Sequence, residues 1–352
     1  MKILSILAAA FGLSFGSRVG WGNHADSPMN LEPRLFLARD SAGWKEFRNK
    51  FGHLRKFRNS TEEEFHARIF QDSEAMVKAQ NDKFARGESG FHLALNQFAD
   101  MTEAEYRSRL LTITKDDVER MKEGSIALDM SSVMAGENSV GRRKREVDWT
   151  YLSPTGDCGS CYAFASVAAI EAHVEKKYGA IFSLSEQDIV DCSSAEGNLG
   201  CDGGFMPNTF KYILKSGINH AELYPYTGEV GTCRHTDTGN FRMLKGFTNI
   251  PSGNETMLQA ALNNVGPVIV AVNSSPDTFK FYSGGIYDEP NCDPNALDHV
   301  MLAVGLLSEN GKPYYLIKNS WGRTTWGEDG FVRMAAGKDM CGISRMCSYP
   351  VV

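Results

Sequence analysis

Hydrophobic and polar residues follow two different patterns along the chain. In the first part, Phe47, Phe51 and Leu54 recur at steps of three and four residues, which is the spacing of an amphipathic helix. Residues 62–81 show the same periodicity among charged residues. The pattern therefore predicts a helical segment over about 44–111.

The second part of the chain reads differently. Residues 160–178 are small and apolar on almost every side of the expected helix, and Gly179 follows them. This pattern predicts a buried helix that ends at the glycine. After about Phe241 the pattern becomes that of strands, with the turn signal Asn310-Gly311 between two of them. The expected strands are 268–272, 300–307, 314–318 and 330–334. A helix-rich half followed by a sheet-rich half predicts an α+β fold, with a site between the halves.

Composition narrows the functional classes. The net charge is −6 and the chain has no broad basic stripe, so we expect no nucleic-acid partner. Residues 1–17 have the layout of a secretory signal peptide, with Lys2, the apolar run 3–13 and small residues up to Ser17. A buried N-terminal helix is the alternative. This run is too short to span a bilayer and no second run of spanning length follows, so we expect a soluble protein of the secretory pathway, destined for the lysosome or the extracellular space.

All 8 cysteines lie at or after Cys158, and entry into the secretory pathway favours disulfides among them. Cys161 stands at the start of the predicted buried helix, within Asp157-Cys158-Gly159-Ser160-Cys161. A thiol at a helix N-terminus is shifted toward thiolate, the nucleophilic form. A redox pair and half of a zinc site are the alternatives for this C-x-x-C spacing. The chain shows neither a βαβ pattern nor a second ligand pair at suitable spacing, and we predict no metal and no cofactor.

A cysteine nucleophile needs a base, and the base needs a group that orients it. His299 begins one predicted strand and Asn319 ends its partner strand across the Asn310-Gly311 turn. The Asn319 side-chain oxygen is then placed to accept from one imidazole nitrogen, with Trp321 shielding that bond from water. Taken singly, His299 reads as a core histidine and Asn319 as a turn residue. Together with Cys161 they predict nucleophilic catalysis.

Four motifs in the second part resemble the papain family of cysteine proteases. They are DCGSCYAF, GCDGGFM, ALDHVMLAVG and KNSWGRTTWGEDGF, in the family's order, and the resemblance runs from about Val147 to the C-terminus. The first part resembles the inhibitory prosegment of cathepsin L relatives. The matching residues are Glu62, Phe70, Val77, Asn81, Asn96, Phe98 and Asp100, while His66, Ser73 and Ala94 depart from the usual Arg, Asn and Gly.

The resemblance implies a zymogen with a two-lobed papain-like fold, a helical left lobe and a β-barrel-like right lobe behind a helical propeptide. It divides the chain into a signal peptide (1–17), a propeptide (18–145) and a peptidase domain (146–352). Within the propeptide, the inhibitor prosegment covers about 44–106, and the charged, weakly apolar stretch 112–145 is expected to be a mobile linker. Processing is expected at or near the basic run 142–145.

The resemblance also implies site residues and partners. Cys161, His299 and Asn319 are the catalytic residues of a cysteine endopeptidase. The expected disulfides are Cys158–Cys201, Cys192–Cys233 and Cys292–Cys341. An apolar pocket for P2, the second residue before the cut, is expected from Phe205, Met206, Ala271, Leu297, Val300 and Met346. The expected partners are protein and peptide substrates, the chain's own propeptide and cystatin-like inhibitors, and we expect a monomer.

Two residues depart from the family near the nucleophile. Thr155 stands six residues before Cys161, where the family has the glutamine of its oxyanion hole, and the segment from Trp149 to Cys161 is several residues short. Tyr162 replaces a tryptophan, a mild change between large aromatics with a polar group. The loss of the glutamine leaves a catalytically impaired papain-like binding protein as the alternative function. A protease inhibitor that uses only the prosegment is a third hypothesis.

Overall fold

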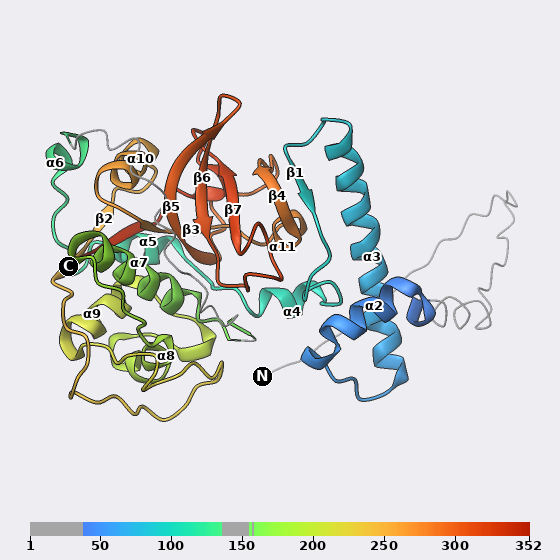
Figure 1. Ribbon diagram of the computed structural model, residues 1–352, viewed down its shortest axis with the longest axis horizontal. Coiled ribbons are helices and arrows are strands. Elements are labelled where there is room, and N and C mark those ends of the chain that lie inside the picture. Colours follow the sequence, from blue (N-terminus) through green and yellow to red (C-terminus); the bar gives the residue numbers. More distant parts are fainter. Residues whose placement is uncertain (1–37, 136–154, 157) are drawn as a thin grey trace, which may run out of the picture.

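The computed structural model describes residues 38–135, 155, 156 and 158–352 (Figure 1). The predicted signal peptide (1–17) and the basic run 142–145 lie outside the described residues. Within them, no helix is long and apolar enough to cross a membrane.

The N-terminal segment (38–135) begins with the predicted helices. Asn59 caps the long helix α3 by accepting from the Glu62 N–H at 3.0 Å. Trp44 and Phe70 meet edge to face, with ring centroids 5.7 Å apart, and join α2 to α3. The elements of this part are α2 (Ala42–Phe51), α3 (Ser60–Ala85), β1 (Phe91–Leu93) and α4 (Glu103–Arg107). The prediction of a helical segment over 44–111 is confirmed for α2, α3 and α4, and it is wrong at Phe91–Leu93, because these residues pair as a strand with residues 282–285 of the sheet.

The stretch 112–135 is the described part of the expected mobile linker (112–145), and it is attached to the rest of the structure. It forms two short helices, α5 (Lys115–Arg120) and α6 (Met130–Ala135). Met121 and Val133 are each 4% exposed, and the Ile126 N–H donates to the Phe247 carbonyl at 2.8 Å. These few apolar residues anchor the stretch on the second part of the chain. The average polarity of the stretch does not reveal them.

The helical lobe follows as α7 (Cys161–Tyr178), α8 (Glu186–Cys192) and α9 (Met206–Ser216). The buried helix predicted at 160–178 is confirmed: its residues from Cys161 to Ile170 are all buried, and Gly179 ends it in the left-handed conformation at φ 69°. Such a helix is stable only inside the protein, and α7 packs against the sheet and against α8 and α9.

The sheet lobe is built on an eight-stranded sheet in the order β1-β4-β7-β6-β5-β3-β8-β2. All neighbouring pairs are antiparallel except β4 with β7. Asn310 and Gly311 have φ of 51° and 76°, which is the positive φ that the predicted hairpin turn needs. The remaining elements are β2 (Gly246–Ile250), α10 (Glu255–Asn264), β3 (Val268–Val272), α11 (Asp277–Lys280), β4 (Tyr282–Tyr287), β5 (His299–Glu309), β6 (Lys312–Lys318), β7 (Phe331–Ala335) and β8 (Cys347–Val351).

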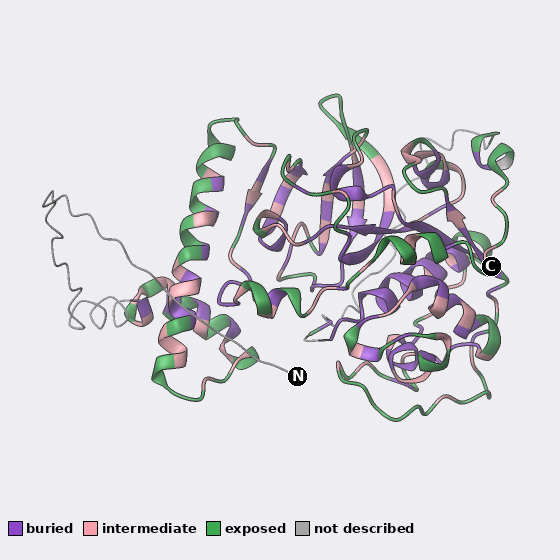
Figure 2. Cartoon of the chain, turned by 180° about the vertical axis from the view of Figure 1, so that it is seen from behind, coloured by how far each residue is buried: buried purple, intermediate pink, exposed green. Residues whose placement is uncertain are grey.

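The sheet is covered on both faces where the two lobes meet. Along β3, Ile269 and Ala271 belong to the apolar cluster around α7, while Val268, Val270 and Val272 belong to the cluster on the other face. Figure 2 shows the buried residues gathered in the sheet and around α7, and the outer surface of α3 largely exposed. Strand β1 extends this sheet by pairing with the edge strand β4, so the N-terminal segment is part of the same structure.

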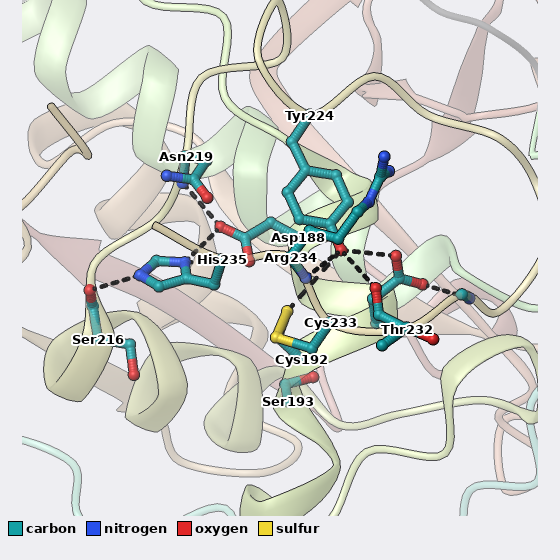
Figure 3. Close-up of a disulfide and its surroundings, with 12 residues drawn as sticks. Asp188, Cys192, Ser193, Ser216, Asn219, Tyr224, Thr232, Cys233, Arg234 and His235 are labelled. Atoms are coloured by element: carbon teal, nitrogen blue, oxygen red, sulfur yellow. Dashed lines mark hydrogen bonds and ion pairs between the residues drawn. A yellow bond between two sulfur atoms is a disulfide. The ribbon is translucent and has the colours of Figure 1, made fainter. Parts of the chain in front are cut away.

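Disulfides fix the loops of both lobes. The three pairs that the resemblance implies, Cys158–Cys201, Cys192–Cys233 and Cys292–Cys341, are formed, and Cys161 and Cys347 are free. Around the second pair, the buried Asp188 carboxylate contacts His235 Nδ1 at 2.9 Å and accepts from the Asn219 N–H at 2.7 Å (Figure 3). The long loop after α9 is thereby held against α8.

Candidate active site

Cys161 is the first residue of α7, and it is 3% exposed. Burial is the largest influence on its thiol and raises the pKa of Cys161 to about 12. The backbone N–H groups of Val300, Tyr162 and Cys161 itself act in the opposite direction, because they stabilise the thiolate. The helix start therefore supplies the donors that a nucleophilic thiolate needs, while burial keeps the group protonated in this structure.

His299 and Asn319 come from neighbouring strands. His299 is the first residue of β5, and Asn319 follows the last residue of β6. The two strands pair with Leu302 opposite Lys318, which brings the ends of both strands together. His299 Nε2 lies 2.8 Å from Asn319 Oδ1, and that oxygen also accepts from the Ser320 N–H at 2.8 Å. Two donors on one oxygen fix the orientation of the amide.

The hydrogen bond to Asn319 defines the tautomer of His299. An amide oxygen accepts only, so Nε2 must carry the proton and Nδ1 of the neutral ring has a free lone pair. His299 Nδ1 is buried and has no hydrogen-bond partner among the described residues. This nitrogen is available to take a proton from a thiol, which is the task of a general base.

Trp321 covers the bond between His299 and Asn319. Its ring stacks on the imidazole with centroids 4.6 Å apart and an interplanar angle of 26°. Trp321 is 6% exposed and also contacts the rings of Phe98 and Tyr106 from the N-terminal segment. The indole ring therefore covers one face of the imidazole.

The N-terminal segment closes the site. The Leu111 N–H donates to the Asp298 carbonyl at 2.7 Å, and Arg109 Nη1 donates to the Gly156 carbonyl at 3.2 Å. One segment thus bonds to the residue before His299 and to the loop before Cys161. His299 is fully buried in this state, and burial lowers its pKa to about 4. Burial thus favours the neutral imidazole and the protonated thiol in this state.

The loop before Cys161 is tied down through its backbone. The Thr155 N–H donates to the Ser320 carbonyl at 3.2 Å, and the Thr155 carbonyl accepts from the Tyr226 hydroxyl at 2.9 Å. The hydroxyl of Ser320 is buried and has no hydrogen-bond partner among the described residues. Thr155 thus stands beside the site, held by main-chain bonds, next to a polar group that no side chain satisfies.

The residues expected to form the P2 pocket lie together. Met206, Ala271, Leu297, Val300 and Met346 are buried in one apolar cluster with Cys161, and Phe205 packs against it. Leu111 belongs to the same cluster. A Cβ on Gly203 would lie 3.0 Å from Leu111 Cδ2, so the glycine leaves room for this leucine. An apolar side chain of the N-terminal segment thus belongs to the same cluster as the six residues.

Sequence reasoning missed three residues of this site: Leu111, Asp298 and Tyr226. Leu111 stands at the end of a helical pattern and resembles any other leucine there. Asp298 acts through its carbonyl, which no side-chain pattern can reveal. Tyr226 belongs to the sequence Tyr224-Pro225-Tyr226, far from Cys161 in the chain, and its polar aromatic type was the single available signal.

Two family descriptions match the chain. Residues 137–351 match "Papain family cysteine protease", and residues 44–106 match "Cathepsin propeptide inhibitor domain (I29)". Among curated proteins, digestive cysteine proteinase 2 of Homarus americanus is 37% identical over 324 residues, which cover 90% of this chain and 96% of that protein. Cathepsin L1 of Drosophila melanogaster is 39% identical over 319 residues, which cover 88% of this chain and 84% of that protein.

Solved structures of cathepsin L proforms are also similar to this chain. The digestive procathepsin L 3 of the Tenebrio molitor larval midgut superposes with a TM-score of 0.74 at 33% identity, covering 89% of this chain and 100% of that one. The digestive procathepsin L2 proteinase of the same larval midgut has a TM-score of 0.74 at 34% identity, covering 88% and 98%. Both are proforms, and the similarity spans the N-terminal segment as well as the two lobes.

Proposed function

The chain belongs to the papain family of cysteine proteases, as a cathepsin L-like zymogen with its propeptide inhibitor domain, and we propose that Cys161, His299 and Asn319 carry its peptidase activity. The observation that carries the proposal is the bond between His299 Nε2 and Asn319 Oδ1, which leaves Nδ1 as a buried acceptor without a partner among the described residues. A general base held in one tautomer is what a thiol nucleophile needs.

The proposed reaction is acyl transfer to water. His299 Nδ1 takes the proton of the Cys161 thiol, and the thiolate attacks the peptide carbonyl carbon. His299 then gives that proton to the leaving amine, and the acyl group stays on sulfur as a thioester. A water loses its proton to His299 and attacks the thioester, and the departing thiolate is regenerated. The Cys161 N–H supplies one donor to the oxyanion.

We further propose that the enzyme prefers apolar residues at P2. Phe205, Met206, Ala271, Leu297, Val300 and Met346 are all apolar, and a charged side chain buried among them would lack a partner. The position of Leu111 in the same cluster supports this, because it is an apolar side chain that already fits there. A peptide library varied at P2 tests the proposal: Leu, Phe or Val is expected to be selected, and selection of Arg or Glu would overturn it.

The propeptide is proposed to act as an intramolecular inhibitor along the secretory route, with the active enzyme in the lysosome or outside the cell. Processing is proposed at or near 142–145, so that the mature chain starts near Glu146. N-terminal sequencing of the purified natural product decides this, and a start inside α3 would count against it. The proposed inhibition rests on Leu111 and Arg109, which bond to both lobes at the site.

One observation favours a second candidate, a papain-like protein with impaired turnover. Thr155 replaces the glutamine of the oxyanion hole, and the Ser320 hydroxyl beside it is buried without a partner among the described residues. The deciding experiment is a peptidase assay of the acid-activated full chain, with Cys161→Ser as the blank. Turnover above the blank supports the first proposal, and alkylation of Cys161 without turnover supports the second.

A further inference from the structure

The hydroxyl of Tyr226 joins the two ends of the loop that precedes the nucleophile. It lies 2.9 Å from the Thr155 carbonyl oxygen and 2.7 Å from Ser160 Oγ. A carbonyl only accepts, so the phenol proton points to Thr155, and the Ser160 hydroxyl must donate to the phenol oxygen. The result is one chain of hydrogen bonds that runs from Ser160 through Tyr226 to Thr155.

Ser160 is the residue before Cys161 and the N-cap of α7. A serine at this position usually accepts a bond from the second or third helical N–H with its side chain. Here the Ser160 side chain makes no such bond, and its hydroxyl is directed to Tyr226 instead. The second N–H of α7, that of Tyr162, is therefore left to act on the Cys161 sulfur, and together with the Cys161 N–H it lowers the pKa of the thiol.

Tyr226 is itself held rigidly. The Ser185 hydroxyl donates to the Tyr224 carbonyl at 2.6 Å, and the Thr227 N–H donates to Gln187 Oε1 at 2.9 Å. Both contacts come from the region of α8, so the backbone on each side of the tyrosine is anchored to one helix. The Tyr226 ring also meets Phe164 edge to face, with centroids 4.8 Å apart. The phenol oxygen is thus fixed in space relative to α7.

We propose that Tyr226 is a positioning residue for the nucleophile: it holds the Ser160 hydroxyl away from the first turn of α7 and so keeps the helix N–H groups free for Cys161. This inference rests on the proposed function of Cys161. Without the phenol hydroxyl, Ser160 turns back to cap α7, and its oxygen competes with the thiolate for the Tyr162 N–H. The consequence is a less acidic thiol, and a structural role alone would not produce it.

The test is the pH dependence of Cys161 alkylation by iodoacetamide in the acid-activated full chain. Tyr226→Phe keeps the ring against Phe164 and removes the hydroxyl. A helix-terminal interaction corresponds to a rise of about half a pH unit in the thiol pKa, and we expect that shift. The double variant Ser160→Ala/Tyr226→Phe has no hydroxyl that can cap the helix, and its profile is expected to return to that of the wild type.

Tyr224→Phe is the matched control. Tyr224 lies two residues away, and its hydroxyl donates to Asp191 Oδ2 at 2.7 Å, so this variant also removes a phenol hydroxyl from the same loop. It is expected to lower the melting temperature and to leave the alkylation profile unchanged. The inference is overturned by a Tyr226→Phe profile that overlays the wild type, by an equal shift in Tyr224→Phe, or by a double variant that keeps the shift.

The same experiment separates this inference from the proposed function. Turnover of a peptide substrate tests whether Cys161 is a catalytic nucleophile, whereas alkylation needs no turnover. A wild-type chain that is alkylated without hydrolysing peptides would remove the peptidase proposal, and the comparison of the four profiles would still report the role of Tyr226. In an active wild type, Tyr226→Phe is expected to lower kcat at mildly acidic pH and to leave KM unchanged.

Discussion

The backbone N–H of Leu111 donates to the backbone carbonyl of Asp298 over 2.7 Å, so the propeptide is bonded to the residue that precedes His299. A main-chain bond of this kind holds the propeptide at the site whatever its side chains are. The Leu111 side chain also belongs to the apolar cluster around Cys161, as the proposed inhibition requires. The backbone of Leu111 and its side chain therefore contribute separately to docking of the propeptide.

Leu111→Ala is expected to weaken inhibition by the propeptide. Leu111 is 7% exposed, and truncating a buried leucine to alanine typically costs about 2–4 kcal/mol. This free energy is lost from docking of the propeptide, because the leucine side chain packs on the peptidase lobes. The unprocessed chain is expected to label faster with an epoxide that reacts at Cys161. Leu54→Ala, at a leucine that is 56% exposed, is the control and should label like the wild type; equal labelling of all three would contradict the prediction.

Docking of the propeptide is expected to weaken as the pH falls. Burial in the zymogen lowers the pKa of His299 from 6.5 to about 4. A histidine with a depressed pKa binds fewer protons in the docked state than in the free state. The docked state is therefore fully favoured above pH 6.5 and is weakened as pH falls from 6.5 toward 4, by up to about 3 kcal/mol.

Hydrogen exchange at the Leu111 amide measures this docking in a Cys161→Ser chain, which cannot process itself. After correction for intrinsic exchange, protection is expected to fall between pH 6.5 and 4. In the double variant with His299→Gln, the part of this loss that comes from the imidazole should disappear. Protection that depends on pH equally in both chains would show that His299 is not the group that titrates.

Much of this site was predictable from the sequence, because its side chains carry their chemistry in their residue types. Cys161 stands at the start of an all-apolar helix, and His299 and Asn319 flank a hairpin that Asn310-Gly311 marks. Those local signals also predicted β3 with its bounds at Val268–Val272. Local pattern and tertiary structure agree in these places because each element buries the face that its period defines.

The rest depends on contacts that no local pattern encodes. Tyr226 meets Thr155 across 71 positions of sequence, through a carbonyl oxygen that every residue has. The helices of the stretch 112–135 are anchored by Met121 and Val133, two apolar residues in a polar stretch. Such single anchors give no periodic signal, so composition alone suggested a linker where the structure has attached helices.

His66 is expected to stabilise the fold of the N-terminal segment. Its Nδ1 lies 2.7 Å from the Asp100 carbonyl oxygen and must donate, so Nε2 accepts from Arg55 Nη1 at 3.2 Å. Arg55 in turn pairs with the carboxylates of Asp100 and Glu105. His66 thus bonds both to the Asp100 backbone and to the arginine that pairs with these carboxylates, in a site where the histidine is 5% exposed.

His66→Ala removes both bonds and leaves the Asp100 carbonyl and Arg55 without this partner. The N-terminal segment should then be less stable by about 1–3 kcal/mol, and self-activation at a fixed pH should be faster. The half-time of processing on a gel measures it. His53→Ala changes an exposed histidine of the same segment and should activate at the wild-type rate. A His66→Ala chain no faster than His53→Ala would refute the role of His66.

The last prediction concerns the oxyanion hole. The Thr155 backbone is tied at both ends, by its N–H to the Ser320 carbonyl and by its carbonyl to Tyr226, so Thr155 cannot move toward a substrate without breaking these bonds. A threonine hydroxyl also reaches less far than a glutamine amide. Losing one oxyanion donor lowers turnover by roughly 10²–10³ in other enzymes. We therefore expect the chain to have a reactive Cys161 and a low kcat.

Restoring a glutamine-bearing segment in the shortened loop before Cys161 should raise kcat by about 10², because the amide adds a donor that acts as the oxygen becomes negative. The rate of Cys161 alkylation should change little, since alkylation forms no oxyanion and the thiolate depends on α7, His299 and Asn319. A control segment of equal length, with alanine in place of glutamine, distinguishes the effect of the amide from the effect of the longer loop. The buried Ser320 hydroxyl, which lacks a partner among the described residues, gives the new amide a group to bond. If the chain as it stands hydrolyses a Phe-Arg peptide as fast as the restored chain, Thr155 or another donor already completes the hole, and the interpretation of Thr155 as a defect is wrong.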